Sequence, residues 1–205
     1  MNVSVFGAGN VGGRLATRWH ELGHRVVVGR RDPQAPAVHL GPGVPCASPA
    51  EAIVDAEVVV LALPADAALA AAEALPLDGR IVVGAMNVVR RPLPAGYASL
   101  FAAVAATLAA ASPSARPVKA FNTLGAETID DPQVAGHPAF LPVAADDVDA
   151  ATAVVRLATD LGYDAVHVGG AERGADLEAM ARLWMALAFG PGALGRGIAL
   201  GLLRR

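Results

Sequence analysis

The feature that most constrains the fold is a glycine-rich turn near the start of the chain. Residues 7–12 read Gly-Ala-Gly-Asn-Val-Gly and directly follow the apolar run 3–6. Over residues 11–22, apolar side chains recur at spacings of three and four, which predicts an amphipathic helix. A Gly-x-Gly-x-x-Gly turn between a strand and a helix is typical of a dinucleotide-binding βαβ unit.

Each glycine of this turn has an expected role. Gly7 permits the tight turn, Gly9 lets the backbone approach a pyrophosphate, and Gly12 lets the helix pack close to the strand. The helix N-terminus adds free N–H groups and the positive end of its dipole. We therefore expect Gly7, Gly9, Asn10, Val11 and Gly12 to bind a cofactor. The alternative is a structural glycine turn that binds no nucleotide.

The end of the second predicted strand indicates which dinucleotide is bound. In this fold an Asp or Glu there accepts hydrogen bonds from the ribose 2′-hydroxyl of NAD. Here the strand 25–29 is followed by Arg30 and Arg31. Two guanidinium groups suit a 2′-phosphate, so we expect NADP(H), with Gly29 leaving room beside the ribose and Asp32 as a partner for an arginine. A solvated arginine pair on an exposed loop is the alternative.

Composition excludes several classes of protein. A chain of 205 residues that is 54% hydrophobic and 17% charged is long enough for one substantial domain with a large core. A net charge of −3 gives no sign of nucleic-acid binding. With Cys46 as the single cysteine, no internal disulfide forms, and no His/Cys cluster suggests a metal. The N-terminal strand leaves no room for a signal peptide, and the charge-free stretch 92–115 is alanine-rich and broken by Pro and Gly. We therefore expect a cytoplasmic protein without a membrane span.

Strand-like and helical segments alternate along most of the chain. This alternation predicts an α/β fold with a Rossmann-type doubly wound, mostly parallel sheet over residues 1–168. Ser48 before Pro49 is typical of a helix N-cap. Further strands are expected at 44–47, 57–63, 80–84, 117–121, 140–144 and 165–168, and helices at 66–75, 98–111 and 148–161.

From Gly169 onward the alternation ends, and we expect a short helical C-terminal segment, residues 169–205. Five apolar side chains share one predicted helical face: Leu177, Met180, Leu183, Trp184 and Leu187. A last apolar helical piece is expected at 198–203. Such a segment cannot bury its apolar side chains alone, so it must pack on the sheet domain, on a second subunit or over a ligand.

Ligands of doubly wound sheets bind beyond the carboxyl ends of the strands. Besides the glycine turn and the arginine pair, this rule selects Leu63 and Pro64 as walls of the cofactor path, and Asn87, Asn122 and Thr123 as polar groups within reach of a nicotinamide carboxamide or a substrate. The alternative for each is a turn or capping role. Lys119, inside a strand sequence, is interpreted as either a snorkelling side chain or a substrate contact.

With these segments in order, the chain resembles the coenzyme F420-dependent NADP oxidoreductase family. Residues 3–12 look like the opening of that family, and residues 23–31 are similar to its second strand, where Ser-Arg or Arg-Arg pairs hold the 2′-phosphate. The run 119–123, Lys-Ala-Phe-Asn-Thr, matches a stretch of its bacterial members, and Leu177-Glu178 resembles its C-terminal segment. One position departs: Asn122 stands where members that bind the deazaflavin often carry a histidine.

The resemblance implies an oxidoreductase that transfers a hydride between NADP(H) and coenzyme F420 as co-substrate. In such a reaction the cofactors carry the chemistry and the protein orients them, so no catalytic side chain is assigned. An NADPH-dependent reductase of another small acceptor (carbonyl, imine or flavin) and a non-enzymatic NADP(H) sensor are alternatives. No nucleic-acid, membrane or metal partner is expected. A homodimer through the C-terminal helices is a separate hypothesis.

Overall fold

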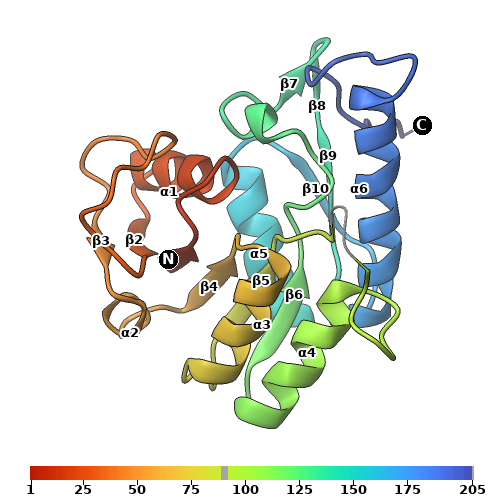
Figure 1. Ribbon diagram of the computed structural model, residues 1–205. Coiled ribbons are helices and arrows are strands. Elements are labelled where there is room, and N and C mark those ends of the chain that lie inside the picture. Colours follow the sequence, from red (N-terminus) through yellow and green to blue (C-terminus); the bar gives the residue numbers. More distant parts are fainter. Residues whose placement is uncertain (89–91, 205) are drawn as a thin grey trace.

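The fold is organised around one six-stranded parallel sheet (Figure 1). The computed structural model describes residues 1–88 and 92–204. The strand order is β3-β2-β1-β4-β5-β6, and all neighbouring strands run parallel. This is the strand order of a dinucleotide-binding doubly wound sheet. It confirms the Rossmann-type fold predicted from the sequence.

The observed elements lie close to the predicted ones. The sheet contains β1 (Asn2–Phe6), β2 (Arg25–Gly29), β3 (Cys46–Ala47), β4 (Val58–Leu61), β5 (Ile81–Gly84) and β6 (Arg116–Lys119). Its connecting helices are α1 (Gly12–Glu21), α2 (Pro49–Ala52), α3 (Ala65–Ala74) and α4 (Leu100–Ala111). Ser48 caps α2 as expected: its hydroxyl accepts the N–H of Glu51, whose carboxylate accepts the N–H of Ser48.

Helices cover both faces of the sheet because its strands are apolar on both sides. On one face, Val5 of β1 packs with Trp19 of α1 and with Leu157 of α5 (Val148–Asp160). The Trp19 indole donates a hydrogen bond of 3.0 Å to the carbonyl of Leu157, so the core joins α1 to α5. On the other face, Leu61 of β4 packs with α3 and α4, for example with Val104.

Beyond β6 the chain adds a smaller pair of strands. The 3₁₀ segment η1 (Ala126–Ile129) and the hairpin β7 (Gln133–Val134) and β8 (His137–Pro138) lead to β9 (Phe140–Val143). After α5, β10 (Asp164–His167) pairs in parallel with β9. The chain just after β9 runs antiparallel to β6, where the backbones of Lys119 and Ala144 exchange hydrogen bonds of 2.8 and 3.0 Å. The strands are therefore mostly, not wholly, parallel, as expected.

The C-terminal segment is one long helix followed by an irregular tail. After the short η2 (Ala171–Arg173), α6 (Gly174–Phe189) packs against α4 (Figure 1). The expected helix at 198–203 is wrong, because these residues form no helix. Instead, the carbonyl of Ile198 accepts the Trp184 indole N–H, and that of Leu200 accepts the N–H of Phe140 next to the small sheet. The tail thus packs on the sheet domain, the first of the three alternatives.

The predicted apolar face of α6 is only partly covered. Leu177 and Trp184 are buried and Met180 is half-buried, whereas Leu183 and Leu187 remain 54% and 38% exposed. The helix lies on the outside of the molecule, so one stripe of it touches the protein and the neighbouring stripe faces water. Within residues 1–88 and 92–204, no helix is long and apolar enough to cross a membrane.

Candidate functional site

The glycine turn connects β1 to α1 at the carboxyl edge of the sheet. Gly7 has a φ of +104°, and a Cβ at this position would lie 2.3 Å from the carbonyl oxygen of Ala62. A Cβ at Gly12 would lie 1.9 Å from the carbonyl oxygen of Gly7. The packing of the protein itself therefore requires these two glycines, in the tight turn and in the close helix contact expected for them.

Gly9 differs from the other two glycines of the turn. A Cβ at Gly9 would meet no heavy atom of the protein within 4 Å, and its φ is not positive. Neither packing nor backbone conformation therefore accounts for glycine at this position. A ligand that approaches the backbone does account for it, and a pyrophosphate binds in this way in dinucleotide folds. In this respect the turn fits a dinucleotide.

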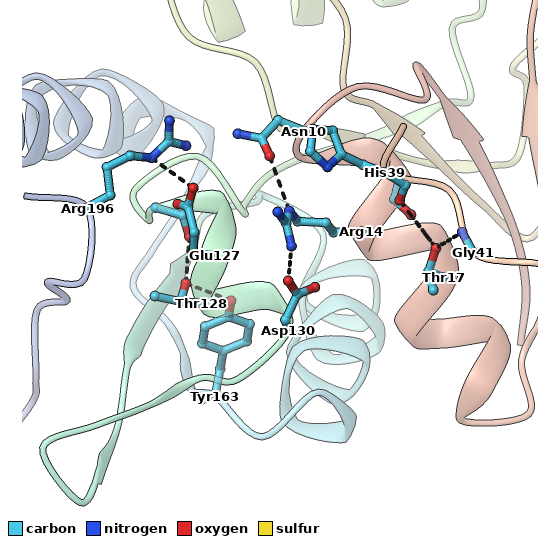
Figure 2. Close-up of polar contacts among 12 residues, drawn as sticks. Asn10, Arg14, Thr17, His39, Gly41, Glu127, Thr128, Asp130, Tyr163 and Arg196 are labelled. Atoms are coloured by element: carbon cyan, nitrogen blue, oxygen red, sulfur yellow. Dashed lines mark hydrogen bonds and ion pairs between the residues drawn. The ribbon is translucent and has the colours of Figure 1, made fainter. Parts of the chain in front are cut away.

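Side chains behind the turn link it to more distant parts of the chain (Figure 2). Arg14 of α1 donates from Nε to Oδ1 of Asn10 at 3.2 Å and forms an ion pair with Asp130, just after η1. Glu127, inside η1, forms an ion pair of 2.8 Å with Arg196 of the tail. The segment around η1 therefore connects the glycine turn to the C-terminal tail.

A cleft of about 790 Å³ lies beside the turn. It joins the ends of three strands: residues 6–8 at the end of β1, residues 29–32 at the end of β2, and Leu63 and Pro64 after β4. Its far wall is helix α3, which presents a row of small side chains: Ala67, Ala70, Ala71 and Ala74. A concave volume of this size with mostly apolar walls is typical of small-molecule and cofactor sites.

Both arginines of the predicted 2′-phosphate site line this cleft. The guanidinium of Arg30 also donates to the carbonyls of Ala35 and Pro36, at 2.6 and 3.2 Å, and so shapes the loop after β2. Arg31 is exposed and has no hydrogen bond or ion pair to the described part of the chain. The guanidinium of Arg31 is therefore available to an anion in the cleft.

Two neighbours of the arginines have other roles than expected. A Cβ at Gly29 would lie 2.7 Å from the ring of Phe6, so the packing of Phe6, and not only a ribose, requires glycine there. The carboxylate of Asp32 accepts the backbone N–H of Gln34 at 3.0 Å. It pairs with no arginine among the described residues, and its hydrogen bond to Gln34 is a turn contact.

A second polar group lies where β5 and β6 end. Nδ2 of Asn87 donates to the backbone carbonyl of Asn122 at 2.7 Å, and Nδ2 of Asn122 donates to Oδ1 of Asn87 at 2.9 Å. Nδ2 of Asn122 also donates to the carbonyl of Leu177 in α6 at 3.0 Å. Both N–H groups of this amide are thus in use. Its Oδ1 is buried and has no partner in the part of the chain that the structure describes.

The residues on either side of Asn122 are also unusual. Phe121 has a φ of +59°, a left-handed conformation that costs free energy for a bulky side chain. Thr123 is 2% exposed, and its hydroxyl has no partner among residues 1–88 and 92–204. Buried polar atoms without partners are rare, and strained backbone is often found at ligand sites. The structure thus brings Asn87, Asn122 and Thr123 to one end of the sheet, and none of the three lines the cleft.

Lys119 does not snorkel, because it is fully buried at the end of β6. Its Nζ donates to the carbonyl of Met86 and lies 3.3 Å from Oε1 of Glu178 in α6. Its partners are therefore protein groups, which argues against the substrate contact as well. The carboxylate of Glu178 in turn accepts the N–H groups of Leu100 and Phe101 at the start of α4. Burial lowers the pKa of Lys119 to about 8, against the opposing influence of Glu178.

The sequence interpretation missed two parts of this region. One is the alanine wall of α3, although alanine at spacings of three and four over residues 67–74 is a signal for a small-residue helix face. The other is the contact of Lys119 with Glu178. Lys119 ends an apolar strand sequence, and Glu178 follows Leu177 of the predicted apolar helix face. Charged side chains in apolar surroundings need a partner of opposite charge, and this is the signal in the sequence for their contact.

Comparison with known proteins shows similarity to NADP-dependent oxidoreductases. Residues 2–88 match the family model described as NADP oxidoreductase, coenzyme F420-dependent. No curated protein sequence matches the chain. A solved structure from Arthrobacter sp. FB24, named "putative f420 dependent nadp-reductase", shares 28% identity with a TM-score of 0.81, and both chains are covered over 100% of their length. A hypothetical protein from Sinorhizobium meliloti shares 25% identity with a TM-score of 0.74, covering 100% of this chain and 96% of that one.

A more distant structure shares the fold alone. A reductive aminase from Aspergillus terreus has a TM-score of 0.67 at 19% identity, covering 90% of this chain and 60% of that one. Sheet, cleft and family match together define an NADP-dependent oxidoreductase of the Rossmann class. Within that class, the match over residues 2–88 and the Arthrobacter structure confirm the resemblance to the coenzyme F420-dependent NADP oxidoreductase family.

Proposed function

We propose that this protein transfers a hydride between NADP(H) and a deazaflavin, coenzyme F420. The observation that carries the proposal is that Arg30 and Arg31 line one cleft together with Gly7 and Ala8 of the glycine turn, whose next residue, Gly9, has open space at its Cβ position. The chain that forms this cleft matches the F420-dependent family over residues 2–88. The deazaflavin enters the proposal through that family and through the name of the Arthrobacter structure.

In this proposal the adenosine half of NADP(H) is held by the cleft. The N–H groups at the start of α1, beside Gly9, bind the pyrophosphate. The guanidinium groups of Arg30 and Arg31 bind the 2′-phosphate by charge-assisted hydrogen bonds. Leu63, Pro64 and the alanines of α3 give the adenine an apolar wall. The unpaired guanidinium of Arg31 supports this assignment, because a 2′-phosphate would be its partner.

The nicotinamide half is assigned to the polar group at the ends of β5 and β6. A primary carboxamide offers N–H donors and one carbonyl acceptor. The two N–H groups of the Asn122 amide are bonded to Asn87 and Leu177, so the atom of this side chain without a partner among the described residues is Oδ1, which is an acceptor. The hydroxyl of Thr123 is able to donate and has no partner among the described residues. These two atoms therefore have the hydrogen-bonding character that a carboxamide requires.

When bound, NADPH would supply a hydride from C4 of its nicotinamide to C5 of the deazaflavin, and a proton from the solvent would complete the reduction at N1 of the deazaflavin ring. The contribution of the chain is to bind the two ring systems, to hold them face to face and to exclude water. NADPH, the deazaflavin and one solvent proton would give NADP+ and the reduced deazaflavin, so atoms and electrons balance.

A second candidate function is the NADPH-dependent reduction of another small acceptor, such as a carbonyl, an imine or a flavin. One observation favours it: the reductive aminase that shares this fold has a structure in complex with NADPH and ethyl-5-oxohexanoate. A third candidate, a non-enzymatic NADP(H) sensor, requires only the nucleotide site.

The test is to mix the purified protein with NADPH and coenzyme F420 and to follow the absorbance of the oxidised deazaflavin. We expect turnover with NADPH and much slower turnover with NADH, because NADH lacks the 2′-phosphate. The absence of turnover over a broad pH range would reject the deazaflavin. A panel of imines, carbonyls and flavins then separates the other candidates, since a sensor would bind NADPH tightly and reduce none of them.

We also propose a homodimer, formed by the C-terminal segment 169–205 of two copies, each attached to a cofactor domain of residues 1–168. Large apolar side chains gather near the end of α6 and remain exposed: Leu183, Leu187, Phe189 and Leu194. Such a patch is typical of an interface. Light scattering should give twice the 20.7 kDa of one chain. Leu183→Glu should shift the protein to the monomer mass, and a wild-type protein that is a monomer at micromolar concentration would contradict the proposal.

A further inference from the structure

Beyond the residues assigned to contact NADP(H), we propose that the buried pair of Lys119 and Glu178 positions the nicotinamide half of the cofactor. The pair acts through the loop after β5 and through α6, without touching the cofactor. The inference rests on the proposed NADP(H) function and on the carboxamide site assigned to Asn122.

The first link runs from Lys119 to Asn87. Nζ of Lys119 donates to the carbonyl of Met86, the residue directly before Asn87. This hydrogen bond fixes the backbone at the point where β5 has ended and the chain passes the end of β6. Asn87 in turn exchanges two hydrogen bonds with Asn122, at 2.7 and 2.9 Å. Lys119 therefore helps to position Asn122 through two adjacent residues: Met86, which it binds, and Asn87, which binds Asn122.

The second link runs from Glu178 to the same amide. Glu178 lies 3.3 Å from Nζ of Lys119, and its two carboxylate oxygens accept the N–H groups of Leu100 and Phe101 at 3.2 and 2.9 Å. These bonds fix the start of α6 against α4. The neighbouring residue, Leu177, accepts the second N–H of Asn122 with its carbonyl. Two consecutive residues of α6 therefore hold Lys119 and Asn122 at the same time.

Stability alone does not explain a charged pair at this place. Both side chains are almost fully buried, with 0% of Lys119 and 3% of Glu178 exposed. Burying two charges costs much of what their attraction returns, and well-packed apolar residues of similar volume are often as stable or more stable. Charged groups do, however, give directed hydrogen bonds that an apolar pair cannot give. The directed bonds to Met86 and to α4 are therefore the property that the pair contributes.

The effect should be confined to one half of the cofactor. Neither Lys119, Glu178, Asn87 nor Asn122 lines the cleft assigned to the adenosine half. Adenosine 2′,5′-bisphosphate carries the 2′-phosphate and the adenine but no nicotinamide. Its affinity therefore reports on the cleft alone, whereas the affinity of NADPH reports on both halves.

The experiment measures both affinities by calorimetry, and kcat with the best acceptor, in three variants of the full chain. The double variant Lys119→Met with Glu178→Leu replaces the pair by apolar side chains and leaves no buried charge unpaired, and thermal unfolding checks that it is folded. Glu178→Gln keeps the shape and removes the charge. Ser112→Ala is the matched control. Ser112 is buried and lies at the end of α4 that is remote from Glu178, and its hydroxyl accepts the N–H of Leu77 at 3.0 Å.

We expect the double variant to bind the bisphosphate within about twofold of wild type and NADPH about tenfold or more weakly, with a lower kcat. Glu178→Gln should show the same pattern to a smaller extent, and Ser112→Ala should change neither affinity. Equal weakening of both ligands would overturn the inference, because the pair would then support only the fold. Unchanged NADPH affinity and kcat would overturn it as well. If wild type bound neither ligand, the proposed NADP(H) function itself would fail, and the inference with it.

Discussion

Nζ of Lys119 and Oε1 of Glu178 lie 3.3 Å apart, and both side chains are buried. Because Lys119 ends β6 and Glu178 lies in the first turns of α6, this pair joins the sheet to the C-terminal segment. It also completes the start of α4, whose first N–H groups bind the Glu178 carboxylate. Three elements that are distant in the sequence therefore depend on one carboxylate.

Removing that carboxylate should destabilise the fold strongly. Glu178→Ala leaves a buried ammonium and the N–H groups of Leu100 and Phe101 without their acceptor. We expect the free energy of unfolding in urea to fall by about 3–5 kcal/mol. Glu178→Gln, which retains an acceptor oxygen, should cost clearly less, and an equal loss in the two variants would contradict this assignment.

The stability of the protein should rise with pH above neutrality. In the folded state burial lowers the pKa of Lys119 to about 8, from 10.5 in the unfolded chain. Between these values the unfolded chain binds more protons at this residue, so the free energy of unfolding increases with pH, by up to about 3 kcal/mol. The buried ammonium thus lowers the free energy of unfolding by its full amount below pH 8, and this loss of stability disappears as the pH approaches 10.5.

Urea titrations between pH 7 and 9.5 test this dependence and avoid an opposing effect at higher pH. Burial raises the pKa of Tyr163, so the unfolded chain loses the tyrosine proton first and stability falls once the pH exceeds about 10. Lys119→Met should remove the rise between pH 8 and 9.5. A wild-type protein that loses stability over this range would contradict the expectation.

Two glycines of the phosphate turn should respond differently to the same substitution. A Cβ at Gly9 meets no protein atom within 4 Å, so Gly9→Ala should change the free energy of unfolding by less than about 0.5 kcal/mol. NADPH binding should still weaken, by about tenfold or more, because the new methyl group occupies the space of the pyrophosphate.

Gly12→Ala is the matched contrast, since its Cβ would lie 1.9 Å from the carbonyl oxygen of Gly7. We expect it to destabilise the fold by about 1–3 kcal/mol. Thermal unfolding and calorimetric titration on both variants separate the two outcomes. Normal NADPH affinity in Gly9→Ala would show that no phosphate approaches this residue.

The arginines should set the preference for NADPH over NADH. Arg31→Ala removes an exposed guanidinium without another partner among the described residues, and we expect NADPH to bind about 10–100-fold more weakly while NADH binding stays nearly unchanged. Arg30→Ala should weaken both nucleotides to some extent, because it also releases the carbonyls of Ala35 and Pro36. Equal losses for both nucleotides in Arg31→Ala would refute the 2′-phosphate assignment.

The parts of the fold that were predictable from the sequence depend on local signals. The strand, the glycine turn and the helix from β1 to α1 are adjacent in the chain, and Gly7 and Gly12 have the roles that their spacing indicates. The capped start of α2 at Ser48 is likewise visible in four consecutive residues. In both cases the signal is confined to a short stretch of the sequence, although the close contact that requires Gly7 is made by Ala62, which is distant in the chain.

The parts that were not predictable depend on contacts between distant segments. The apolar content of 198–203 favours a helix, but five glycines between positions 190 and 201 weaken it, and bonds to Trp184 and Phe140 determine the path of the chain instead. Similarly, the interpretations of Lys119 as snorkelling or touching substrate did not include Glu178, which reaches it only because α6 packs on α4.

The alanine wall of α3 has a thermodynamic consequence for the cleft. A methyl side chain has no rotamers, so Ala67, Ala70, Ala71 and Ala74 lose no side-chain conformational entropy when a ring lies against them. Longer side chains in the same row would each have to be ordered on binding. The shape of this wall is therefore set by the helix backbone, and the wall should have nearly the same form before a nucleotide arrives as after it has bound.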